Sequence, residues 1–216
     1  MPANVSYISA FFNKDGVEGP RVTRGYIPCW IVGTNHKKSA NFVGREDQVP
    51  SRYDAMGASG VTIATGVDLG QTDRGSLSAY GVSDELIDKL SRYIGKKRDA
   101  AIAELHKAPL TITSSEAAEL DHAVHRGYLM RYVRPAYDKA SKVHFDDLPE
   151  QAQAVVFSIC YQHGCGGVKK NCPATWKWLT TQNWAEASEE LRKRFHPPYP
   201  YINRRRIEGN LLRELL

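Results

Sequence analysis

The segment between Pro149 and Gly164 is the most apolar helical stretch of the chain. Proline is well tolerated at the start of a helix and glycine is common just after its end, so these two residues bound the helix. Its apolar residues are Ala152, Val155, Val156, Phe157 and Ile159. A helix this apolar has to be covered by other elements. We therefore expect it to lie at the centre of the core.

Helical patterns continue through the last two thirds of the chain. Thr113 and Glu116 have the spacing of a capping box and predict a long helix that ends before Pro135. Further helical signals are the acidic turn after Ser83, the starts at Pro173 and Asn183, and the stripe Ile207, Leu211, Leu212 and Leu215. These patterns indicate a helical lobe.

The first third of the chain has a different pattern. Tyr26–Val32 and Val61–Val67 are rich in β-branched and aromatic residues and predict a small sheet or hairpin. Between them, Gly33–Ser59 is polar and irregular, which indicates a loop or insertion of undetermined role. We expect an α+β fold in one domain, residues 1–216, with an N-terminal helix and small β-hairpin lobe (1–75) and a larger helical lobe (76–216).

The charge balance narrows the possible partners. The chain has 29 Lys and Arg against 24 Asp and Glu, a formal charge of +5, which favours anionic polymers such as nucleic acid, a cell wall or an anionic membrane surface. The basic residues are scattered and match no nucleic-acid-binding signature. No apolar run reaches the roughly 18–20 residues of a membrane span, and the first residues do not resemble a secretory signal. We expect synthesis in the cytoplasm, no membrane span and a monomer.

The chain contains four cysteines, Cys29, Cys160, Cys165 and Cys172. Four are too few for a disulfide scaffold in a chain of 216 residues. Cys160, His163 and Cys165 lie close in sequence, but their spacing does not match the familiar structural zinc sites. We therefore expect no metal and no cofactor, and either buried thiols or one disulfide.

Two short segments of the first third combine glycine with carboxyl or hydroxyl groups. Glu18 precedes a glycine after an apolar stretch, and Thr62 and Asp68 lie between Gly60 and Gly70. Singly, such a glutamate is usually solvated and such an aspartate usually caps a turn. Together they provide what glycosidic hydrolysis needs, an acid for the leaving oxygen and a second group on the opposite face of the sugar.

The stretch of residues 59–71, SGVTIATGVDLGQ, resembles the signature of the pesticin family, whose members are related to phage lysozymes. The resemblance continues at 157–164 and 173–176, and in a closing pattern that includes Trp184, Tyr199 and Glu208. In that family a Glu, a Thr and an Asp six residues after the Thr form the site. These positions fall on Glu18, Thr62 and Asp68.

The resemblance implies a muramidase that cleaves peptidoglycan between N-acetylmuramic acid and N-acetylglucosamine. Glu18 would be the general acid, held protonated by partial burial or a nearby carboxylate, Asp68 the ionised partner, and Thr62 the group that holds the water. Tyr26, Tyr161 and Gln162 are candidates for contacting the sugars. Relatives of this kind invert the anomeric centre, but the sequence does not distinguish inversion from retention.

Several alternatives remain open. The loop between Val32 and Ser59 is longer than the family pattern, and Glu46 within it competes with Glu18 for the acid role. The chain could instead be an inactive wall-binding homologue or a basic nucleic-acid-binding protein. The sequence also does not distinguish a phage endolysin released by a holin from a bacteriocin or a secreted effector. A toxin would require an immunity protein as partner.

Overall fold

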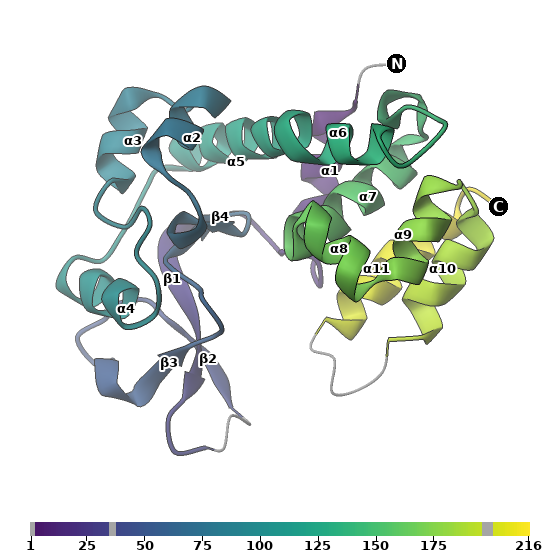
Figure 1. Ribbon diagram of the computed structural model, residues 1–216. Coiled ribbons are helices and arrows are strands. Elements are labelled where there is room, and N and C mark those ends of the chain that lie inside the picture. Colours follow the sequence, from purple (N-terminus) through teal and green to yellow (C-terminus); the bar gives the residue numbers. More distant parts are fainter. Residues whose placement is uncertain (1–2, 35–37, 196–200) are drawn as a thin grey trace. The chain divides into compact units, whose positions relative to one another are not determined.

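The computed structural model describes residues 3–34, 38–195 and 201–216, so Tyr199 of the closing pattern lies outside the described residues (Figure 1). The expected mixture of helices and a small sheet is confirmed. The chain forms two compact units, Pro20–Val124 and a second unit of Met1–Gly19 with His125–Leu216. The boundaries of these units differ from those of the expected lobes, which were residues 1–75 and residues 76–216.

The sheet belongs to the unit Pro20–Val124 and is antiparallel. Its strands are β1 (Val22–Ile31), β2 (Ser39–Phe42), β3 (Tyr53–Ala55), β4 (Thr62–Ala64) and β5 (Val67–Asp68). The strand order is β2-β1-β4-β5, and β3 also pairs with β1. The segment expected to be irregular, 33–59, therefore supplies two strands and the 3₁₀ turn η1 (Pro50–Arg52). The stretch 61–67 is a tight β4–β5 hairpin.

Short helices complete this unit. They are η2 (Leu69–Gln71), α2 (Arg74–Tyr80), α3 (Asp84–Leu90), α4 (Arg98–Lys107) and the first part of α5 (Ser114–Tyr128). The predicted capping box of α5 is confirmed, since Glu116 accepts the backbone N–H of Thr113 at 2.6 Å and the Thr113 hydroxyl accepts that of Glu116 at 3.1 Å. These reciprocal bonds satisfy two N–H groups that the helix itself cannot pair.

The expected end of this helix before Pro135 is wrong. A π-helical turn, η3 (Leu129–Val133), follows α5 and leads directly into α6 (Arg134–Asp138). Pro135 lies in the first turn of α6. The chain therefore stays helical past the proline.

The other unit is helical. Besides α6 it contains α1 (Val5–Phe12), η4 (Phe145–Asp147), α7 (Glu150–His163), α8 (Cys165–Asn171), α9 (Pro173–Thr180), α10 (Trp184–Lys193) and α11 (Ile202–Arg213). The predicted central helix is confirmed, because every residue of α7 from Ala152 to Cys160 is buried. Helices α1, α8 and α11 pack against α7, and α10 packs along α11 (Figure 1). None of the described helices is both long and apolar enough to cross a membrane.

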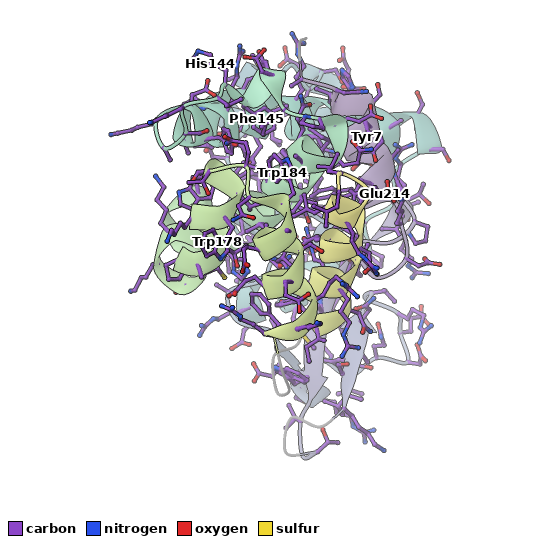
Figure 2. The ribbon with its side chains drawn as sticks, turned by 90° about the vertical axis from the view of Figure 1, so that its right-hand side faces the viewer. Tyr7, His144, Phe145, Trp178, Trp184 and Glu214 are labelled. Atoms are coloured by element: carbon purple, nitrogen blue, oxygen red, sulfur yellow. The ribbon has the colours of Figure 1, made fainter. Side chains whose placement is uncertain are left out.

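The N-terminal helix α1 joins this unit through its packing. Phe12 at its end makes an edge-to-face contact with Phe157 of α7, with ring centroids 5.1 Å apart. On another side of α1, Tyr7 lies near Glu214 at the end of α11 (Figure 2), and burial, followed by the charges of Glu150 and Glu214, raises its pKa. These contacts explain why the first residues group with the C-terminal helices and not with the sheet.

A buried aspartate fixes the β4–β5 hairpin to α5. Asp121 is only 1% exposed, and it accepts the backbone N–H of Thr65 at 2.8 Å and the Thr65 hydroxyl at 2.6 Å. Its other partner is Nε of Arg21 at 2.6 Å. Ala64 and Gly66 on either side of Thr65 have φ of 54° and 73°, so the turn is left-handed at both. The bonds to Asp121 stabilise this uncommon conformation.

We predict that Asp121→Ala lowers the free energy of unfolding by about 2–4 kcal/mol, because it leaves the buried Thr65 N–H and the Arg21 guanidinium without their acceptor. Urea unfolding measures this change. The matched control is Asp88→Ala, whose carboxylate pairs with Arg74 at 2.6 Å on the surface. This control should change stability by less than about 1 kcal/mol. Equal effects of the two substitutions would contradict the assigned role of Asp121.

Candidate functional site

Three of the residues predicted to act lie in one row across the sheet. Tyr26 of β1 pairs with Thr62 of β4, and Thr62 pairs with Asp68 of β5. Directly paired residues of antiparallel strands project from the same face with their Cβ atoms about 4.5–5.5 Å apart. Thr62 is buried, and Tyr26 and Asp68 are half-buried. The structure therefore brings the predicted Thr and Asp together with the predicted aromatic contact.

The carboxylate of Asp68 is held by backbone N–H groups. Its Oδ1 accepts from Gly70 at 2.8 Å and from Gly60 at 3.0 Å, so Asp68 also caps η2, as an aspartate at this position often does. Burial raises the pKa of Asp68, opposed by these two bonds, by Gln71 and by the charge of Lys97. The result is a half-buried carboxylate in a fixed orientation.

Glycine at 60 and 70 is required by the closeness of the two backbones. A Cβ on Gly60 would lie 2.4 Å from the carbonyl oxygen of Lys96 and 2.6 Å from Cα of Gly70. A Cβ on Gly70 would meet the same carbonyl at 2.6 Å. Backbone atoms cannot yield to such contacts, so only glycine lets both N–H groups reach Asp68. The glycines that bound the predicted segment therefore shape its aspartate site.

Glu18 lies in the helical unit, in the turns that follow α1. The backbone N–H of Glu18 donates to the carbonyl of Phe12 at 3.2 Å, and that of Gly19 donates to Lys14 at 3.2 Å. The side chain of Glu18 is 22% exposed and forms an ion pair with Nη1 of Arg204. The direct partner of the Glu18 carboxylate is therefore the guanidinium of Arg204, and not the second carboxylate that was expected from the sequence.

Arg204 is part of a buried hydrogen-bonded network on α7 and α11. Its Nη2 donates to the Ser158 hydroxyl at 2.9 Å, and this hydroxyl donates to Glu208 at 2.5 Å. Nη2 of Arg205 donates to Glu208 at 2.6 Å and to Oε1 of Gln162 at 2.7 Å. Gln162 and Glu18 are thus connected to one network, although they are far apart in sequence.

Two of the three arginines at 204–206 are buried together with their glutamate partner. Arg204 and Arg205 are 4% and 0% exposed, and Glu208 is 0% exposed. Arg206 alone of the three is exposed. The spacing of three and four residues from these arginines to Glu208 was the signal available in the sequence. Nothing in the sequence indicated the partner Ser158.

Tyr161 and His163 lie beside Gln162 at the end of α7. Tyr161 packs against Phe12 and Phe157, with ring centroids 5.3 Å and 5.5 Å apart, so it is a half-buried member of an aromatic cluster. Burial, followed by the charges of Arg205 and Arg204, lowers the pKa of His163 to about 4. His163 is therefore neutral near pH 7. Within the described ranges, no group of three or more His, Cys, Asp or Glu could hold a metal ion.

The competing acid, Glu46, lies in an exposed turn between β2 and η1. Each unit thus carries its own part of the predicted site. The sheet carries Tyr26, Thr62 and Asp68, and the helical unit carries Glu18, Tyr161 and Gln162. Glu18 differs from Glu46 in being partly buried and held by an arginine.

Comparison with known families gives a match over residues 35–185, to the pesticin family, described as a bacterial toxin homologue of phage lysozyme. The match covers more than half of the chain and includes Thr62, Asp68, Tyr161 and Gln162, whereas Glu18 and Tyr26 precede it. No curated protein matches the chain. On the family match and the α+β fold, the chain belongs to the pesticin family of bacterial toxins homologous to phage lysozyme.

Proposed function

We propose that this protein is an N-acetylmuramidase that cleaves the β-1,4 bond between N-acetylmuramic acid and N-acetylglucosamine in peptidoglycan. The observation that carries the proposal is the pair of Thr62 and Asp68, side by side on β4 and β5 within the segment that matches the family. A buried hydroxyl beside an oriented, half-buried carboxylate can position a water molecule for attack on an anomeric carbon. The family membership supports glycoside hydrolysis as the chemistry.

In this proposal Glu18 protonates the departing glycosidic oxygen. Asp68 orients the attacking water or stabilises the positive charge that develops on the sugar, and Thr62 binds that water. The proposal requires Glu18 and Asp68 to act on the same glycosidic bond. Arg204 acts as a positioning residue, because its ion pair selects one orientation of the Glu18 side chain. Tyr26, Tyr161 and Gln162 are proposed to contact the glycan.

The proposed setting follows from the substrate. Peptidoglycan lies outside the cytoplasm, so we propose that the protein acts in the periplasm after release through a holin lesion or delivery by a secretion system. The formal charge of +5 favours approach to the anionic cell wall. If the protein acts as a toxin between bacteria, an immunity protein that blocks the site is its expected partner.

Glu18→Gln should reduce the release of reducing ends from purified peptidoglycan by about 10²–10⁴-fold, because glutamine keeps a hydrogen bond to Arg204 but cannot donate the proton. The matched control is Glu46→Gln, which should retain the activity of the parent protein. Circular dichroism and thermal unfolding should show that both variants are folded. Full activity of Glu18→Gln with loss in Glu46→Gln would transfer the acid role to Glu46.

Asp68→Asn should also reduce this activity, by at least about 10²-fold. Asparagine retains an oxygen that can accept from Gly60 and Gly70, so the cap of η2 is preserved while the charge is removed. Asp73→Asn is the control, since Asp73 caps α2 through the backbone N–H of Ser76 at 2.8 Å in the same unit. Unchanged activity of Asp68→Asn would show that Asp68 is only a cap.

A further inference from the structure

Two of the four cysteines contact each other at the junction of α7 and α8. Cys160 is buried in the last turns of α7, and Cys165 is the first residue of α8, with only Gly164 between the two helices. The thiol of Cys160 hydrogen-bonds to the sulfur of Cys165. All four cysteines are free thiols in this structure. Both members of the pair are therefore reduced.

One member of the pair is open to solvent through a basic pocket. A pocket of about 570 Å³ is lined by Cys165 together with Arg131, Lys139 and Lys169. Tyr128 also lines it, and its hydroxyl donates to the carbonyl of Cys160 at 3.0 Å. Cys165 is half-buried, whereas Cys160 is 0% exposed. An anionic thiol reagent could therefore reach Cys165 first, with the cations of the pocket attracting it.

We propose that Cys165 is a redox-active nucleophile and that it forms a disulfide with Cys160 by exchange with a low-molecular-weight anionic disulfide. The thiolate of Cys165 attacks one sulfur of that disulfide, which forms a mixed disulfide and releases one thiolate. Cys160 then loses its proton and attacks the sulfur of Cys165, so that the second thiolate leaves. The external disulfide is reduced to two thiols, and the two cysteines are oxidised to one disulfide.

The electrostatic surroundings of the four thiols support this order of events. The hydrogen bond from Cys160, together with the charge of Lys169, lowers the pKa of Cys165 against the effect of burial. Burial raises the pKa of Cys29 to about 12 and also raises that of Cys172. Because the thiolate is the nucleophile, the lowered pKa of Cys165 agrees with its position in the pocket, and both favour Cys165 as the attacking thiol.

The bridge would close the segment that carries two of the proposed glycan contacts. Tyr161 and Gln162 lie between the two cysteines in sequence, and Gly164 at the helix junction has φ of 70°. A disulfide across this junction restricts the backbone between Cys160 and Cys165. An oxidising compartment favours the bridged form and a reducing cytoplasm the dithiol form.

Intact-mass spectrometry of the reduced, full-length protein after incubation with excess oxidised glutathione tests the proposal. We expect the mass to fall by two hydrogen atoms, and alkylation of the oxidised protein after unfolding in denaturant to label two cysteines, Cys29 and Cys172. Cys165→Ser should abolish this bridge. Cys160→Ser should instead accumulate a stable glutathione adduct on Cys165, and Cys29→Ser should form the bridge as the parent protein does.

Three results would overturn the proposal: no reaction of the parent protein, a glutathione adduct that persists in it, or a bridge that still forms in Cys165→Ser. If Cys160→Ser does not fold because its site is buried, Cys165→Ser at the half-buried position still decides the question. The experiment measures the mass of the protein and not the lysis of peptidoglycan. Its outcome is therefore independent of whether the protein cleaves peptidoglycan.

Discussion

The buried network around Glu208 is the interaction on which the helical unit depends. Glu208 accepts from Ser158 of α7 and from Arg205 of its own helix, and Arg204 extends the network to Glu18. Buried charges are tolerated only when they are paired and hydrogen-bonded, and loss of one partner is strongly destabilising. The network therefore sets how α7, α11 and the turn after α1 pack. In doing so it fixes the orientation of the proposed acid.

In the unit that contains the sheet, carboxylates are held in one orientation by backbone N–H groups. Asp68 binds the N–H groups of Gly60 and Gly70, and Asp121 binds that of Thr65. Both carboxylates thus hold the short β4–β5 hairpin, one at its base and one at its turn. Thr62 starts this hairpin and is buried, so its side chain has little freedom. A side chain held in this way loses little conformational entropy when a ligand binds to it.

Local signals in the sequence predicted the helices well, because caps act over three or four residues. Thr113 with Glu116, and Asn183 with Glu186, form the expected bonds. The sequence predicted a small sheet or hairpin from 26–32 and 61–67, but not that 61–67 itself turns back as a hairpin. That turn depends on left-handed residues held by Asp121 from α5. The ion pair of Glu18 with Arg204 joins residues 186 positions apart, and no local pattern indicates such a contact.

Family resemblance singled out Glu18, Thr62 and Asp68 as site residues, and the pairing of Thr62 with Asp68 came from the structure. The proposed activity gives these three residues one role. The most direct test is digestion of purified peptidoglycan by the unmodified protein, with borohydride reduction of the products and mass spectrometry of the fragments. The account predicts disaccharide peptides whose reduced end is N-acetylmuramitol. Fragments that end in N-acetylglucosaminitol, or glycan strands that stay intact, would contradict it.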